Sequence, residues 1–237
     1  MIMPTLDIRR AGERFTTKID WLDSKHSFSF GPHYDPANTH HGLLLVNNDD
    51  VVRAGTGFGT HPHRDMEIVT WVLSGELEHK DSEGNHGAIL PGHAQRMSAG
   101  RGIRHSERNP SSTTDVHFLQ MWVPPDTDGI DPGYEQLDVG AELAGGGLIP
   151  VASGRGHGAA IGIHQRGAVL WVARLDPGAA ADVPDDRHVH VFVARGSGVV
   201  DPGGPLGTGD AARLTDADGV TFTAGAGGAE VLFWATA

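Results

Sequence analysis

Four residues in the first half of the chain have the types and the spacing of metal ligands. His61 and His63 stand two positions apart, and so do His105 and Glu107. In an extended strand, residues i and i+2 point to the same face, so each pair can present both side chains together. If the two strands face each other inside a barrel, three imidazoles and one carboxylate converge. Such a donor set suits a divalent transition metal and leaves coordination positions open for water, oxygen or a substrate.

β-Strands, rather than helices, are predicted to carry both pairs. Residues 68–73 are β-branched, aromatic or aliphatic, and Gly75 ends this run before a second short strand. Residues 81–85 have the composition of a turn, and Pro91–Gly92 interrupts the next stretch. The residues between the two candidate ligand pairs therefore predict a β unit rich in hairpins.

The residues on either side of this β unit predict further strands and turns. Residues 43–46 are aliphatic and predict a strand, whereas the run Asn-Asn-Asp-Asp at 47–50 is typical of a turn. Downstream, residues 116–123 predict a strong strand, which the Pro-Pro-Asp-Thr-Asp-Gly run at 124–129 ends. We place the best candidate for a domain boundary at this second run.

Composition restricts the classes of protein to consider. The chain has 237 residues with 34 Gly and 14 Pro and no long helical pattern, which favours an all-β protein. The absence of Cys excludes disulfides, thiolate ligands and Cys nucleophiles. A net charge of −12 without a basic cluster argues against direct binding of nucleic acid. The N-terminus lacks a signal-peptide pattern and no apolar run could span a bilayer, so we expect a cytoplasmic protein without a membrane partner.

The residues around the two ligand pairs resemble the sequence motifs of a known superfamily and, more narrowly, of one family within it. The run Gly55…His61-x-His63-x3-Glu67…Gly75 is similar to the first cupin motif, and Pro91-Gly92…His105-x3-Asn109 is similar to the second. Residues 58–67 and 98–107 are more specifically similar to the pirin family. This resemblance extends to residues 28–31 and 120–124. It implies an all-β bicupin made of two stacked double-stranded β-helix (jelly-roll) barrels.

The second half of the chain repeats the first in outline. Strands are predicted at 168–173, 189–193 and 231–234, so we expect an N-terminal cupin at 1–130 and a C-terminal cupin at 131–237. When Gly75 is aligned with Gly196, Asp182 and Pro184 occupy the places of His61 and His63. His188 and His190 fall out of register with the ligand pairs. We therefore expect the N-terminal barrel to bind the metal and the C-terminal barrel to have lost its site.

The resemblance also implies a ligand set and a metal. Pirin-like proteins would hold one divalent transition metal through His61, His63, His105 and Glu107. In many cupins the carboxylate of the first motif is the ligand, but the pirin pattern uses Glu107, so we expect Glu67 to support the site or to lie at the surface. Fe(II) is the metal that we expect, while Ni, Co, Cu and Zn also suit these donors. His79, His86 and His93 fall near predicted turns, where we expect them to be exposed.

Pirin-like proteins include quercetin 2,3-dioxygenases, and the resemblance implies the same activity here. A phenolic flavonol and O2 would be the substrates, the ring would open with release of CO, and Glu107 or a carboxylate near it would act as the base. The alternative is a non-enzymatic, iron- or redox-sensing pirin that binds and regulates a partner protein. A different lyase, isomerase or oxygenase activity also remains open, because the cupin fold hosts many chemistries.

Overall fold

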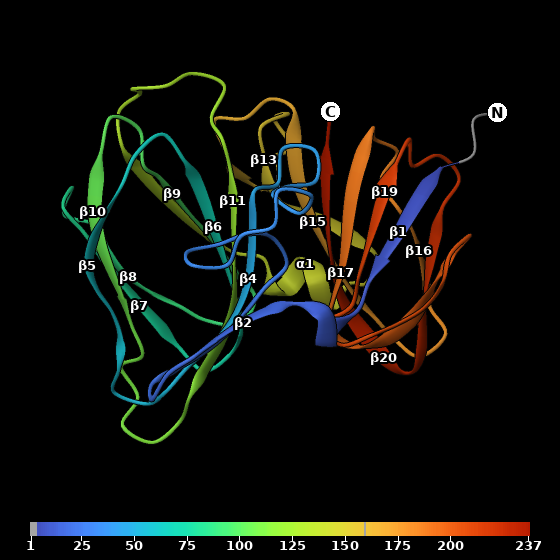
Figure 1. The fold of residues 1–237 in the computed structure, drawn as a ribbon, viewed down its shortest axis with the longest axis horizontal. Coiled ribbons are helices and arrows are strands. Elements are labelled where there is room, and N and C mark those ends of the chain that lie inside the picture. Colours follow the sequence, from blue (N-terminus) through green and yellow to red (C-terminus); the bar gives the residue numbers. More distant parts are fainter. Residues whose placement is uncertain (1–3, 159) are drawn as a thin grey trace.

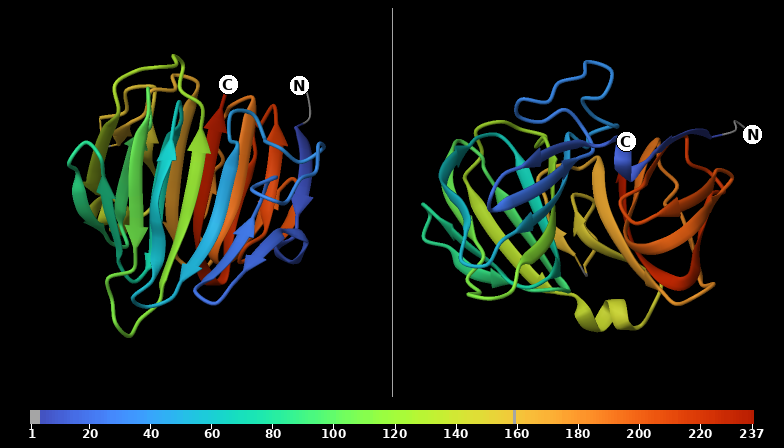
Figure 2. Two further views of the ribbon diagram at one scale, coloured as in Figure 1. Left: turned by 60° about the vertical axis from the view of Figure 1, so that its left-hand side comes forward. Right: turned by 60° about the horizontal axis from the view of Figure 1, so that its bottom comes forward.

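The computed structural model describes residues 4–158 and 160–237, which form two β-barrels side by side (Figures 1 and 2). The strands of the first half are β1 (Thr5–Arg9), β2 (Phe15–Lys18), β3 (Leu22–His26), β4 (Val46–Val52), β5 (Gly57–His63), β6 (Glu67–Ser74), β7 (Leu77–Asp81), β8 (His86–Ile89), β9 (His93–Ser98), β10 (Ile103–Arg108) and β11 (Val116–Val123). Those of the second half are β12 (Gly133–Asp138), β13 (Leu148–Ser153), β14 (Ile161–Gly162), β15 (Ala168–Leu175), β16 (Ala180–Asp182), β17 (His188–Asp201), β18 (Gly204–Gly207), β19 (Ala211–Thr215) and β20 (Thr221–Thr236). The helices are a 3-10 turn at Ala11–Glu13 and α1 (Gly140–Ala144).

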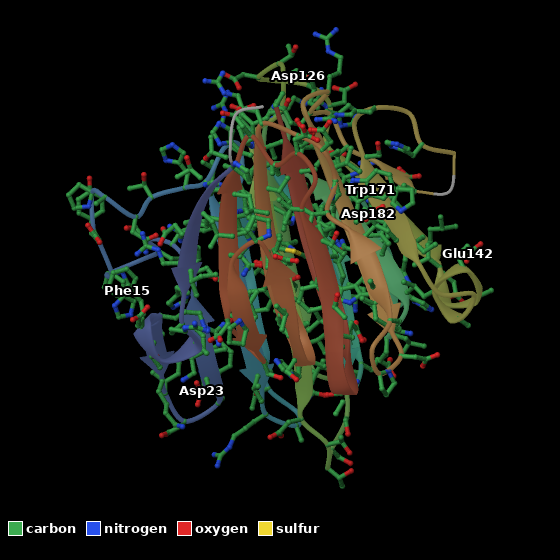
Figure 3. The ribbon with its side chains drawn as sticks, turned by 90° about the vertical axis from the view of Figure 1, so that its right-hand side faces the viewer. Phe15, Asp23, Asp126, Glu142, Trp171 and Asp182 are labelled. Atoms are coloured by element: carbon green, nitrogen blue, oxygen red, sulfur yellow. The ribbon has the colours of Figure 1, made fainter. Side chains whose placement is uncertain are left out.

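Two sheets enclose the first barrel, and one large sheet forms most of the second. In the first barrel, a seven-stranded sheet in the order β12-β9-β6-β11-β4-β3-β2 lies opposite a four-stranded sheet in the order β5-β10-β7-β8. In the second barrel, nine strands share one sheet, which Figure 3 shows from its own side of the molecule. The all-β bicupin predicted from the sequence is therefore confirmed.

The position of strand β6 between two cores explains why its sequence is a continuous apolar run. Val69, Trp71 and Leu73 pack into a core shared with Leu170 and Trp234 of the second barrel. The alternate residues of β6, such as Val72, point into the first barrel and pack with its own small core. Because both faces of the strand are covered, the usual alternation of polar and apolar residues is missing.

Two strands pair across the predicted domain boundary at residue 130. Strand β1 adds to the sheet of the second barrel by pairing antiparallel with β19, where it lies beside that strand in Figure 1. Strand β12 pairs with β9 and so extends the sheet of the first barrel. The division into 1–130 and 131–237 stays a prediction, and backbone hydrogen bonds connect the halves on both sides of it.

The turn predicted at residues 47–50 is wrong, because β4 runs from Val46 to Val52 through all four of them. Asn47, Asn48 and Asp50 are buried, although their side chains are polar. Strand β4 lies between β3 and β11 and is hydrogen-bonded to both. The predicted strand at 43–46 is reduced to an isolated bridge between His41 and Leu44 ahead of β4. Among the described residues, no helix is long and apolar enough to cross a membrane.

Candidate metal centre

His61, His63 and His105 come together at the paired strands β5 and β10. In this antiparallel pair His105 lies opposite His61 and Ile103 lies opposite His63. The ring centroids of the three histidines are 4.5 to 4.9 Å apart. Each ring offers one nitrogen within 4.8 Å of the nitrogens of the other two. The two ligand strands are therefore neighbours in one sheet, and they do not face each other across the barrel.

A β-bulge places Glu107 relative to these histidines. The register shifts between His105 and Glu107, so that Glu107 pairs with Phe58 and Arg108 pairs with Gly57. Bulges of this kind re-aim side chains next to functional sites. At Gly57 the two strands approach so closely that an added Cβ would lie 2.6 Å from the Cα of Arg108 and would also meet the Glu107 carbonyl oxygen. Only glycine fits at position 57 without a shift of β10.

The hydrogen bonds around His61 and His63 leave ring nitrogens free to bind a metal. Nδ1 of His61 donates to the Gly59 carbonyl oxygen at 2.7 Å, which leaves the lone pair on Nε2. Nε2 of His63 is buried and has no hydrogen-bond partner among the described residues. Burial, reinforced by the neighbouring histidines, lowers the pKa of His63 to about 4 and that of His105 to about 3. Both rings are thus neutral at pH 7, which is the form that binds metal ions.

A chain of hydrogen-bonding groups extends from the far side of His105. Its Nδ1 lies 3.5 Å from Nδ1 of His79, and Nε2 of His79 lies 3.1 Å from a carboxylate oxygen of Asp81. Burial opposes the ionisation of Asp81, but hydrogen bonds from His79 and Asn85 lower its pKa below the usual value. If Asp81 accepts the proton of His79 Nε2, then His79 Nδ1 accepts that of His105 Nδ1, and His105 Nε2 keeps its lone pair.

His79 is fully buried, so the prediction that it is exposed is wrong. It lies within β7, where every second side chain points inward, rather than in the turn that follows. The side chain of His86 is exposed, as expected, and His93 is half-buried. Together with His105 and Glu107, His79 forms a second group of ligand atoms within 4.8 Å of one another. Both groups found among the described residues lie in the first barrel.

Gln120 on β11 is a site residue that the sequence reasoning missed. Its Nε2 lies 3.0 and 2.8 Å from the two carboxylate oxygens of the buried Glu107. Trp122 Nε1 in turn donates to Gln120 Oε1 at 3.2 Å, which fixes the orientation of the amide. The alternation of β11 could have identified Gln120, because residues 118, 120 and 122 share one face. The structure thus holds Glu107 in place from the opposite sheet.

Glu67 lies apart from both groups of candidate ligands and joins the two barrels. It is fully buried and accepts hydrogen bonds from Ser98 Oγ at 2.9 Å and from the His164 backbone at 3.0 Å. His164 belongs to the second half of the chain. Glu67 is therefore not a surface residue, and its carboxylate serves the contact between the barrels.

A cavity of about 470 Å³ opens onto the candidate metal ligands. His61, His63 and Glu107 line one side of it. Aromatic side chains form a second part of the wall, namely Trp21, Phe30, Phe58 and Trp122. Buried polar side chains of the seven-stranded sheet form a third part, namely Ser24, His26, Asn48, Asp50 and Gln120. The cavity can therefore hold a flat aromatic molecule that also carries polar groups.

Comparisons of sequence identify relatives along nearly the whole chain. The Pirin family pattern matches residues 8–123, and the pattern described as the quercetinase C-terminal cupin domain matches residues 150–234. The quercetin 2,3-dioxygenase of Escherichia coli strain K12 is 40% identical, with 95% of this chain and 96% of that protein covered. A Mycobacterium bovis protein that is provisionally named a quercetin 2,3-dioxygenase is 56% identical over 97% of this chain and 94% of its own length.

Comparisons of structure give the same result. The crystal structure of YhhW from Escherichia coli has a TM-score of 0.91 and 39% identity, with 98% of both chains covered. A crystal structure of the bacterial pirin YhhW in complex with nickel(II) has a TM-score of 0.88 and 38% identity, with 98% of this chain and 99% of that chain covered. The two-barrel fold, the cluster of histidines and these relatives agree, and the chain belongs to the pirin family.

Proposed function

We propose that this protein binds one divalent transition metal through His61, His63, His105 and Glu107 and acts as a dioxygenase of the quercetin 2,3-dioxygenase type. The reaction would open the central ring of a flavonol with O2 and release CO. The observation that carries the proposal is the convergence of three imidazoles, two of which have pKa values low enough to stay neutral, beside a cavity. The names of the relatives support the same reaction.

The donor atoms fit such a metal. Three imidazoles and one carboxylate suit Fe, Ni, Co, Cu and Zn, and the affinity order alone does not select one of them. We propose Fe(II), because a redox-active metal can take part in the chemistry of O2. The nickel(II) complex of the similar Escherichia coli pirin supports binding of a divalent metal and makes nickel the first alternative.

The residues of the cavity have separate tasks in this proposal. When bound, the metal would supply a Lewis-acid and redox centre for the flavonol 3-hydroxyl and O2. The aromatic side chains Trp21, Phe58 and Trp122 would bind the flat rings and exclude water. Gln120 would hold the Glu107 carboxylate in one orientation. A cavity carboxylate would take the proton of the 3-hydroxyl, and the sequence pattern proposes Glu107 for this role.

The test is aerobic turnover of quercetin by the iron-loaded protein, followed through loss of the flavonol absorbance and release of CO. His105→Ala removes a proposed ligand and should abolish turnover. His86→Ala is the matched control, because it removes an exposed histidine of the same sheet. Absence of turnover by fully loaded wild type would contradict the dioxygenase. It would favour the alternative, an iron-dependent pirin that binds a partner protein.

A further inference from the structure

The wall of the cavity formed by β3, β4 and β11 carries buried polar side chains in register. Ser24 pairs with Asp50, His26 pairs with Asn48, and Asn48 pairs with Gln120 on its other side. All five side chains line the cavity and belong to residues that are at most 8% exposed. Burying polar groups costs free energy unless they find partners, so each of these residues requires a reason.

Most of these side chains have a partner within the protein. Nδ1 of His26 lies 2.8 Å from Asn48 Oδ1, and Nε2 of His26 lies 2.9 Å from Thr17 Oγ1. Gln120 is bonded to Glu107. Asp50 is the exception, because its Oδ1 is buried and has no hydrogen-bond partner among the described residues. One carboxylate oxygen of a cavity-lining residue therefore lacks a partner among the described residues.

The surroundings of Asp50 raise the pKa of its carboxyl group toward neutrality. Burial raises its pKa to about 7, and the charges of Asp49 and Glu107 act in the same direction. Ser24 on β3 opposes this shift by hydrogen bonding to the carboxylate. A carboxyl group with a pKa near neutrality is suited to act as a general base at physiological pH.

Glu107 is less free to act as that base. Both of its carboxylate oxygens accept hydrogen bonds from Gln120 Nε2, and the proposed function assigns the same group to the metal. A base needs a lone pair that points at the proton it removes. Of the two carboxylates that line the cavity, only that of Asp50 has an oxygen without a hydrogen-bond partner among the described residues.

We propose that Asp50 binds the 3-hydroxyl of a flavonol in the cavity and removes its proton. The O–H bond breaks, its electron pair stays on the ligand oxygen, and the proton forms a new bond to the carboxylate of Asp50. The resulting carboxylic acid stays hydrogen-bonded to the flavonol oxyanion. This assignment rests on the proposed function, because it takes the ligand of the cavity to be a hydroxylated flavonol.

The test measures binding of quercetin to the metal-loaded protein under argon, where oxygenation does not occur. A deprotonated flavonol absorbs at longer wavelength, so one titration gives both the affinity and the protonation state of the bound ligand. Asp50→Asn keeps the shape of the side chain but cannot accept the proton. We expect on the order of tenfold weaker binding and a midpoint for deprotonation of the bound ligand at least about one pH unit higher.

Two controls separate a role in binding from a structural role. Asp23→Asn makes the same chemical change on β3, but Asp23 does not line this cavity and instead accepts a hydrogen bond from Lys18. This variant should bind and deprotonate quercetin like wild type. 3-O-Methylquercetin lacks the proton that Asp50 would remove, so wild type and Asp50→Asn should bind it equally. Melting temperature and metal content verify that each variant is folded and loaded, and Asp50→Ser provides a second variant.

The outcomes for the two proposals differ. If Asp50→Asn binds quercetin with the affinity and the spectrum of wild type, the role of Asp50 is overturned while the dioxygenase still stands. If wild type binds and deprotonates quercetin under argon, Asp50→Asn does not, and no turnover follows in air, the role of Asp50 stands while the dioxygenase fails. A wild type that binds no flavonol overturns the assignment.

Discussion

Nε2 of His61 and Nε2 of His105 lie 3.1 Å apart at directly paired positions of β5 and β10. The other nitrogen of each ring is engaged, by the Gly59 carbonyl oxygen for His61 and by His79 for His105. Both Nε2 atoms are therefore turned toward the same point beside His63. The sheet itself, rather than a flexible loop, determines the geometry of the candidate metal centre.

The first prediction concerns the stoichiometry of the metal. Wild type should bind one divalent ion per chain, because the two groups of candidate ligands share His105. His61→Ala and His105→Ala should each lower the affinity at least about tenfold, since each removes a donor from a site of four. Elemental analysis after dialysis, combined with competition against a coloured chelator, measures both quantities. Binding of two ions, or full retention of metal by both variants, would be inconsistent with a single centre.

The second prediction concerns the chain from His105 through His79 to Asp81. His79→Leu removes the group that faces Nδ1 of His105 and should weaken metal binding by roughly 10–100-fold, the range typical of partners that orient a ligand. The same chelator competition measures the change, with His86→Ala on the neighbouring strand as the control. Unchanged affinity in a folded His79→Leu variant would show that His79 does not orient His105.

The third prediction concerns the close approach of β5 and β10. Gly57→Ala should displace Glu107 and lower the free energy of unfolding by about 1–3 kcal/mol, because the new methyl group meets the backbone of β10. Metal affinity should fall as well. Gly59→Ala is the matched control on the same strand, since no atom of the described residues lies within 4 Å of the added Cβ. Equal stability and affinity for the two variants would refute the packing argument.

The fourth prediction concerns stability against pH. In the folded protein burial raises the pKa of Asp50 to about 7, above its unfolded value of 3.8, so the folded state binds more protons between these values. The contribution of Asp50 to stability is therefore present below the unfolded pKa and is lost as pH rises through about 7. Asp50→Asn has no carboxyl group to ionise, so its free energy of unfolding does not fall in this way. Relative to that of wild type, it should rise by on the order of 2 kcal/mol between about pH 5 and about pH 8.

Urea unfolding of the metal-free proteins at both pH values measures this difference. Asp23→Asn should show no such gain relative to wild type, because Lys18 and Lys25 lower the pKa of Asp23 despite its partial burial. A stability difference between Asp50→Asn and wild type that does not change with pH would contradict the raised pKa.

Strand alternation was sufficient to predict part of the site from the sequence. The spacing indicated that His61 and His63 share one face and that His105 and Glu107 share another, and the three histidines come together in the structure. That β5 and β10 are neighbours in one sheet could not be derived in this way, because alternation orients side chains but does not choose which strands pair.

The missed residues share one physical cause. Asn48 and Asp50 have the composition of a turn, yet they lie in β4, where the inner face of the barrel is polar. His79 was assigned to a turn for a similar reason. Sequence patterns assume that polar residues are exposed, and this assumption fails where a barrel encloses a polar cavity. The polar residues that surround the candidate centre are therefore the ones that the sequence pattern placed wrongly.

The most direct test of the central claim is a reaction of the iron-loaded protein with quercetin under oxygen-18 gas. The proposed function predicts that each quercetin consumed releases one CO and that the organic product carries both labelled oxygen atoms. His105→Ala should give neither CO nor label. Consumption of quercetin without CO, or a product labelled only from water, would contradict a metal-centred dioxygenase in this member of the pirin family.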